Sequence, residues 1–306
     1  MTETVPSQMT SCESSLAAQE ALMATAPRTD VWILLEYDKP WGAQALEQSD
    51  LPEGIKAYIN QQMAAIPNAR FQFIRRGGNM GGIDLFVARS SVHLPRLYHF
   101  RLDSYDDLLS YDLAAIAADR SEYTLSDQKL FLVCTNGKRD VCCAKHGLPL
   151  VQAMSQIAPE AVWQTTHIGG HRFAATLVCL PEGVYYGRVP TERSAALIQA
   201  HQRGEMLLDY SRGWCVYDAP TQAADHFLRQ ETGEVGLGAF ECLGVEGIEP
   251  NRWRAHFRRL GEDFIHTVTF HAELSGSTVF QNTGDAEPMR VKVYSLDEYT
   301  AARVDE

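Results

Sequence analysis

An order of elements that occurs twice along the chain is the strongest constraint on its fold. Each copy is predicted as strand, helix, strand, glycine loop, strand, strand and helix, over residues 30–120 and 126–204. Apolar runs that fit buried strands and apolar residues at helical spacing define these elements. A glycine pair follows the second strand in both copies, at Gly77–Gly78 and Gly169–Gly170. Such self-similarity indicates two units built on one plan.

The repeated order predicts an α/β fold of tandem thioredoxin-like halves, because a β-α-β unit followed by a hairpin and a helix is the thioredoxin-like arrangement. Residues 1–29 are expected to form a flexible leader that can hold one helical stretch. Residues 30–120 are expected to be a degenerate half without metal ligands, and residues 126–204 the half with a functional site. Residues 205–306 are expected to be a small α+β appendage, in which no chemistry-bearing motif occurs.

Composition and charge exclude several partners. The 306 residues are 45% hydrophobic and 22% charged, as in an ordinary soluble globular protein. The net charge of −12 argues against nucleic acid and against an anionic membrane surface. No apolar run approaches the ~20 residues needed to span a bilayer, and the first residues do not form a secretory signal.

Cysteine usage indicates the compartment. Seven scattered cysteines without a secretory signal are typical of a reducing cytoplasm, where clustered cysteines bind metal or perform redox chemistry. We therefore expect a cytoplasmic protein.

Cysteines and histidines gather at the predicted ends of two strands in the second half. Cys134 begins a loop after a buried strand, and Cys142 and Cys143 end it. His167 and His171 flank a glycine pair after the next strand. Open α/β sheets place functional loops at such strand ends. Two thiols and two imidazoles are therefore expected to converge at one edge of the sheet.

Thiolates with imidazoles suit either zinc or an iron–sulfur cluster. Zinc fingers usually place their cysteines two to four residues apart. The eight residues between Cys134 and Cys143 can wrap a larger object than one ion. Glycines would let backbone N–H groups approach a bridging sulfide. From this chemistry alone, zinc and a [2Fe–2S] cluster remain nearly tied.

The run Cys134-Thr-Asn-Gly-Lys-Arg-Asp-Val-Cys-Cys143, followed by His167-Ile-Gly-Gly-His-Arg-Phe-Ala174, resembles the sucrase/ferredoxin-like family. The resemblance covers roughly residues 10–240. Further runs that look like bacterial members are Ser11-Cys12, Trp32-Ile-Leu-Leu-Glu36, Pro40-Trp41-Gly42 and Leu180-Pro-Glu-Gly-Val-Tyr-Tyr-Gly-Arg-Val189.

The resemblance implies a thioredoxin-like ferredoxin fold with a [2Fe–2S] cluster. It implies Cys134, Cys143, His167 and His171 as ligands, with Cys143 chosen over Cys142. Family members often have histidine where this chain has Asn136. The implied function is electron transfer or another redox role, as a carrier rather than a stand-alone enzyme.

The donor and acceptor of electrons are not indicated by the sequence. No G-x-G-x-x-G turn is present, so a protein redox partner is expected to supply the electrons. No paired-carboxylate signature supports sugar hydrolysis, so the chain is not expected to be a glycosidase.

Two alternatives stay open. The first is a zinc-stabilised thioredoxin-like binding module, and the second is a thiol oxidoreductase that uses Cys142, Cys143 or Cys134. His146 is a spare histidine near the loop that could replace a ligand.

The other charged residues and cysteines are expected to have structural roles. Asp140 is expected to cap a helix or to bind the loop. Basic side chains near the loop are expected to be surface charges, although they could stabilise a reduced cluster. These are Lys138, Arg139 and Arg172. Four cysteines are expected to be buried thiols, namely Cys142, Cys179, Cys215 and Cys242, and Cys12 receives no role.

Overall fold

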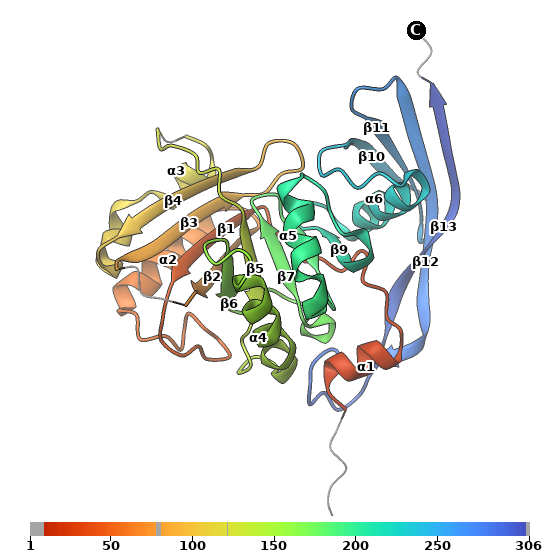
Figure 1. Cartoon of the computed structure of the whole chain (residues 1–306). Coiled ribbons are helices and arrows are strands. Elements are labelled where there is room, and N and C mark those ends of the chain that lie inside the picture. The colour runs from red at the N-terminus through yellow and green to blue at the C-terminus, as the bar shows by residue number, and fades with distance from the viewer. Residues whose placement is uncertain (1–8, 78–80, 121, 304–306) are drawn as a thin grey trace, which may run out of the picture.

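Two β-sheets organise the chain in a computed structural model that describes residues 9–77, 81–120 and 122–303 (Figure 1). The larger sheet has nine strands in the order β4-β3-β1-β2-β6-β5-β7-β8-β9, and the smaller has the order β10-β11-β12-β13. The first nine strands are β1 (Val31–Glu36), β2 (Ala69–Arg75), β3 (Ile83–Arg89), β4 (Arg96–Leu102), β5 (Leu130–Cys134), β6 (Val162–Thr165), β7 (Leu177–Leu180), β8 (Val184–Tyr186) and β9 (Ser211–Trp214). The smaller sheet consists of β10 (Phe240–Glu249), β11 (Arg252–Arg259), β12 (Phe264–Val279) and β13 (Met289–Arg303). The α/β prediction is confirmed.

The large sheet contains two runs of strands with the same pairing. β1 is parallel to β2 and antiparallel to β3, which pairs with β4. In the same way β5 is parallel to β6 and antiparallel to β7, which pairs with β8. The two runs meet where β2 and β6 pair antiparallel, with Ile74 opposite Thr165. Gly78 of the first glycine pair lies outside the described residues.

Helices flank both sheets. They are α1 (Ser11–Ala17), α2 (Glu53–Ala65), α3 (Leu113–Ala117), α4 (Val141–Ser155), α5 (Ser194–Gln202) and α6 (Ala219–Thr232), with short 3-10 turns η1 (Tyr105–Ser110), η2 (His171–Phe173), η3 (Thr191–Arg193) and η4 (Leu208–Tyr210). The sequence predicts that the last helix of the first copy is capped by Ser104 and continues to Ile116, but the structure has η1 followed by α3 there. Two caps explain the break, because Ser104 caps η1 and the Asp112 side chain caps α3.

The alternating direction of the side chains along β5 determines which face of the sheet Cys134 lies on. Phe131 and Val133 pack in one apolar cluster with residues of α4 and α5. Leu132 and Cys134 face the opposite side, because successive strand residues point to opposite faces. Both faces of β5 are buried, so the cysteine at its end lies in the interior.

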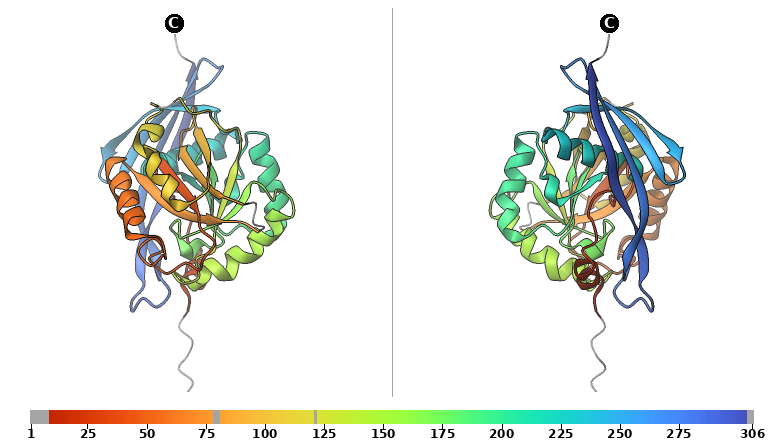
Figure 2. Two further views of the ribbon diagram at one scale, coloured as in Figure 1. Left: turned by 90° about the vertical axis from the view of Figure 1, so that its left-hand side faces the viewer. Right: turned by 90° about the vertical axis from the view of Figure 1, so that its right-hand side faces the viewer.

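The C-terminal residues are more closely joined to the large sheet than expected. β9 lies within the predicted appendage, yet it pairs with β8 and completes the large sheet. The long β12–β13 hairpin extends from the small sheet to α1 (Figures 1 and 2). There Phe280 N donates to Ser14 Oγ at 3.0 Å, and Ser11 N donates to Thr283 Oγ1 at 3.1 Å.

The predicted flexible leader contains an ordered helix. Thr10 and Glu13 form a capping box at the start of α1. Cys12 and Ser15 are buried, and α1 packs against η2. Residues 10–17 are therefore part of the packed structure, because both η2 and the β12–β13 hairpin contact them. None of the described helices is long and apolar enough to cross a bilayer.

Acid sensitivity is expected from His201 on α5. Its Nε2 lies 2.7 Å from Tyr186 Oη, and burial lowers the pKa of His201 from 6.5 to about 3. Below pH 6.5 the unfolded state binds a proton that the folded state excludes, so stability falls as the pH falls. Between pH 7 and pH 5 this residue should remove about 2 kcal/mol of the free energy of unfolding.

Denaturant titrations of wild type and His201→Gln at pH 7 and pH 5 test this expectation. The stability advantage of wild type over the variant should be smaller at pH 5 than at pH 7. A difference independent of pH would contradict the assignment.

Candidate metal centre

The ends of β5 and β6 bring the two predicted loops together. The strands are parallel, with Cys134 opposite Thr165 in the register. Thr135 N donates to Thr165 O at 3.1 Å, which keeps the chains side by side beyond the strand ends. The loop after β5 leads into α4 with Cys143, and the loop after β6 contains His167. The two loops therefore lie side by side at one edge of the sheet, as expected from the order of the strands.

Cys134, Cys143 and His167 form a group that could hold a metal ion. Their ligand atoms all lie within 4.8 Å of one another. His167 Nδ1 is 3.9 Å from Cys134 Sγ and 3.7 Å from Cys143 Sγ. Both cysteines are buried and His167 is half-buried. The choice of Cys143 over Cys142 agrees with this geometry.

His171 lies outside this group of three, next to His167. The centroids of the His167 and His171 rings are 5.0 Å apart. His171 Nε2 is 2.7 Å from the carbonyl oxygen of Gln281, in the β12–β13 turn. Its Nδ1 is buried and has no hydrogen-bond partner among the described residues. Burial lowers the pKa of His171, which favours the neutral imidazole that binds metals.

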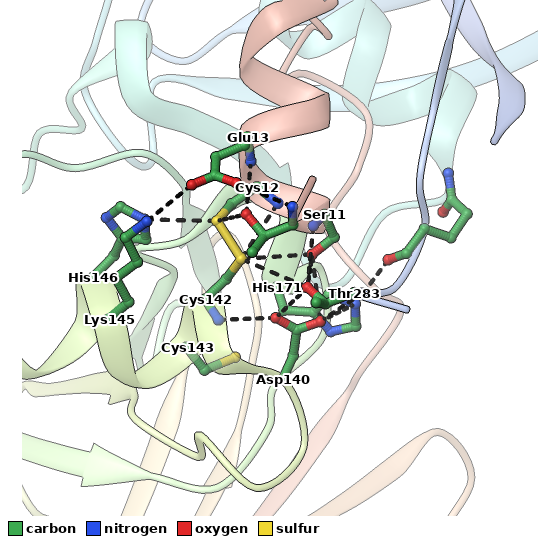
Figure 3. The surroundings of a disulfide bond; sticks show 12 residues. Ser11, Cys12, Glu13, Asp140, Cys142, Cys143, Lys145, His146, His171 and Thr283 are labelled. Atoms are coloured by element: carbon green, nitrogen blue, oxygen red, sulfur yellow. Dashed lines mark hydrogen bonds and ion pairs between the residues drawn. A yellow bond between two sulfur atoms is a disulfide. The ribbon is translucent and has the colours of Figure 1, made fainter. Parts of the chain in front are cut away.

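Asp140 connects the site to Ser11 on α1 and to the β12–β13 turn (Figure 3). It caps α4, accepting from Cys142 N at 2.9 Å. It also accepts from Thr283 N at 3.0 Å and lies 3.5 Å from His171 Nε2. Burial acts to raise the pKa of Asp140, but hydrogen bonds from the backbone of Thr283 and Cys142 outweigh it and lower the pKa. The predicted capping role is confirmed, and the links to Thr283 and His171 are additional.

The two buried thiols influence each other's ionisation. A hydrogen bond from the Cys143 thiol lowers the pKa of Cys134, with a further hydrogen bond from His167 in the same direction. The same interaction raises the pKa of Cys143, and burial adds to that rise. A thiolate, the form of cysteine that binds metals, is therefore favoured at Cys134.

Cys142 forms a disulfide with Cys12, contrary to the expectation of an extra buried thiol (Figure 3). The bond joins α1 to the first turn of α4, beside Cys143. None of the candidate ligand cysteines forms a disulfide. The sequence did not indicate this pair, because the two cysteines are 130 residues apart.

The glycine pair is explained by a buried arginine. Gly169 and Gly170 have φ values of +99° and +75°, and a Cβ on Gly170 would overlap the guanidinium of Arg212. Arg212 Nη1 donates to Gly169 O at 3.0 Å, and burial lowers the pKa of Arg212 to about 9. The close approach expected for a sulfide is made here by Arg212.

None of the remaining candidates belongs to the group formed by Cys134, Cys143 and His167 among the described residues. His146 Nε2 is 3.6 Å from Cys12 Sγ, so it lies at the disulfide. Arg172 pairs with Glu20 at 2.9 Å, and Asn136 Nδ2 donates to Gly42 O at 3.0 Å. Lys138 and Arg139 are exposed, Cys179 and Cys215 are buried, and Cys242 is half-buried.

A sequence model of the family described as sucrase/ferredoxin-like matches residues 22–213. The chain belongs to the sucrase/ferredoxin-like family. The matched span includes Cys134, Cys143, His167 and His171. Cys12 and the β12–β13 turn lie outside the matched span.

One relative of the chain is named altered inheritance of mitochondria protein 32, from Meyerozyma guilliermondii. It is 32% identical over 142 residues, which are 42% of this chain and 49% of the relative. This chain therefore matches about half of that protein's length. No solved structure matches the chain.

The sequence did not indicate three residues that lie near the centre. Gln281 contributes only its backbone carbonyl, and such a contact does not depend on the residue type. Thr283 belongs to a turn that is remote in sequence from the ligands. Cys12 was visible only as part of the family resemblance.

Proposed function

We propose that the chain binds a [2Fe–2S] cluster and serves in electron transfer or another redox role. Cys134, Cys143, His167 and His171 would be the ligands, with two tandem thioredoxin-like halves as the scaffold. The observation that best supports the proposal is the buried Nδ1 of His171, which has no partner among the described residues and belongs to a ring next to that of His167. A buried polar atom without a partner is costly unless a ligand satisfies it.

The tautomer of His171 favours metal binding. Its Nε2 is at hydrogen-bond distance from the carbonyl of Gln281, which can only accept. Nε2 must therefore have the proton, and Nδ1 retains its lone pair. Metal-binding histidines usually donate their other ring N–H to a carbonyl or a carboxylate in this way. Two thiolates and two neutral imidazoles make the donor set, which suits an iron–sulfur cluster of higher potential than an all-cysteine one.

The approach of a redox partner is expected on the His167 side. His167 is the half-buried member of the four, whereas the other three are buried. It lines a cavity of about 360 Å³ together with Phe71, Gln72, Asn136 and Arg139. A protein that exchanges electrons with the site would meet this surface first.

The strand pairing supports the tandem scaffold. β1 to β4 and β5 to β8 share one pattern of parallel and antiparallel neighbours. Only the second run places cysteines after its first strand, in agreement with a first half without ligands.

Zinc is the second candidate, and a specific observation favours it. Two ligands on one tetrahedral zinc, with bonds of about 2.3 and 2.1 Å, are separated by about 3.6 Å. The 3.7 and 3.9 Å between His167 Nδ1 and the two sulfurs are close to that value. In this case the metal would stabilise a thioredoxin-like binding module.

Metal analysis of the full chain, purified without oxygen, separates the two candidates. The cluster predicts a brown protein with about two irons and two acid-labile sulfides per chain, and an EPR signal after reduction. A colourless protein with one zinc and no sulfide would reject the cluster in favour of the zinc module.

A further inference from the structure

The Cys12–Cys142 disulfide borders a cavity of about 440 Å³ that is separate from the metal centre. Its volume is in the range of small-molecule sites. Cys12 lines this cavity and retains 6% of its surface exposed, whereas Cys142 is fully covered. The two sulfurs therefore differ in access, and a molecule in the cavity meets Cys12.

A proton acceptor stands beside the accessible sulfur. His146 lines the same cavity, and its Nε2 is 3.6 Å from Cys12 Sγ. Burial lowers the pKa of His146, and the neighbouring Lys145 acts in the same direction. The ring is therefore neutral near pH 7 and can accept the proton of an incoming thiol.

The covered sulfur has neighbours that suit a leaving group. Cys12 N donates to Cys142 Sγ at 3.3 Å. A hydrogen bond from a backbone N–H stabilises negative charge on the sulfur that accepts it, so displacement at Cys12 with departure of Cys142 is the favoured direction.

Arg188 lines the cavity wall, and no salt bridge joins it to a carboxylate in the part of the chain that the structure describes. Arg188 donates to Glu20 O at 2.7 Å and to Ser15 Oγ at 2.8 Å, both of which are neutral groups. Its Nε is buried and finds no acceptor among the described residues. Arg172 lines the cavity as well, but it is neutralised by Glu20. The charge of Arg188 is thus available to an anionic ligand.

We propose that Cys12–Cys142 is a thiol–disulfide exchange site for a low-molecular-weight thiol that has a carboxylate group. The substrate thiol gives its proton to His146, and its sulfur bonds to Cys12 Sγ. The Cys12–Cys142 bond breaks, and its electron pair leaves on Cys142 Sγ. A second thiol then displaces Cys12 from the mixed disulfide. Two substrate thiols become one substrate disulfide, and the protein disulfide becomes two cysteine thiols.

A low-molecular-weight thiol fits this site better than the dithiol of a protein does. Cys12 lies against a cavity wall formed by α1, α4 and the segment around Arg188, with little surface exposed. The proposal does not depend on the metal centre, since neither cysteine is among the proposed ligands.

The first experiment locates the attacked sulfur. Full-length Cys142→Ser and Cys12→Ser proteins are incubated with oxidised glutathione, quenched with acid and mapped by peptide mass spectrometry. Cys12 in the first variant should gain one glutathionyl group at least about tenfold faster than Cys142 in the second. Equal rates, or faster modification of Cys142, would overturn the proposal.

The second experiment measures reduction of the intact disulfide by two probes, reduced glutathione and uncharged 2-mercaptoethanol. His146→Gln should slow both reactions by about 10- to 100-fold, whereas His256→Gln on β11 should slow neither. Arg188→Gln should slow the reaction with glutathione and leave that with 2-mercaptoethanol unchanged. The reaction with 2-mercaptoethanol thus controls for misfolding.

Three outcomes of the second experiment would overturn the proposal. They are reduction only in denaturant, equal slowing of both probes by Arg188→Gln, and reduction by a thioredoxin-class dithiol but not by glutathione. Iron and sulfide contents are measured on the same samples, so loss of the cluster is distinguishable from loss of exchange.

Discussion

Replacement of His171 by alanine is expected to lower the metal affinity of the chain by at least about a hundredfold. The substitution removes a buried ring nitrogen that has no partner among the described residues, on a ring whose centroid lies 5.0 Å from that of His167. The side chain lies at the edge of the core, in the short turn η2, so secondary structure should persist. Iron and sulfide per chain, measured after anaerobic reconstitution and desalting, provide the readout.

The control for this substitution is His256→Ala. His256 lies on β11 and contacts Thr267 in the small sheet, away from the ligand group. It should retain the iron content of wild type. The ligand assignment would fail if His171→Ala kept its iron while His146→Ala lost it, because His146 would then be the fourth ligand.

Gly147→Ala is expected to destabilise the protein by about 2 kcal/mol or more, although alanine is the better helix former. Gly147 lies in α4 against β5, and an added Cβ would overlap the carbonyl oxygen of Cys134. The two nearest atoms are the carbonyl oxygen and carbon of Cys134, which belong to the backbone of β5, so the helix must move away from the strand. The same movement would separate Cys143 from Cys134. The free energy of unfolding, measured by denaturant titration, and the iron content per chain should therefore both fall.

Gly54→Ala is the matched control. Gly54 is also helical, in the first turn of α2, and an added Cβ there meets no atom within 4 Å. Alanine at this position should stabilise the chain by about 0.5–1 kcal/mol. Equal effects of the two substitutions would show that α4 can move from β5 without cost.

Much of the site could be predicted because it depends on local sequence. Cys134 follows an apolar run that could only be a buried strand, and His167 follows the next one. Once the two strands are parallel neighbours, their ends must share an edge of the sheet. The choice between Cys142 and Cys143 depended on family resemblance, and the first turn of α4 gives the physical reason. Cys143 lies toward His167, whereas Cys142 lies toward α1.

The surroundings of the site could not be predicted because they depend on contacts between remote segments. Cys12 meets Cys142 across 130 residues, and Gln281 meets His171 across 110. Neither contact has a periodicity or a motif in the sequence. The helix expected after Ser104 failed for a local reason, since the capping role of Asp112 was not recognised.

The covering of His171 by the β12–β13 turn has a consequence for the order of assembly. A ribosome releases Cys134, Cys143, His167 and His171 well before Gln281, which lies 110 residues beyond His171. During synthesis the four side chains can therefore gather while His171 Nε2 is still open to water. The carbonyl that fixes its tautomer arrives only when the last hairpin folds back. On the proposed ligand assignment, a metal would reach His171 most easily in that interval, before the completed hairpin covers the ring.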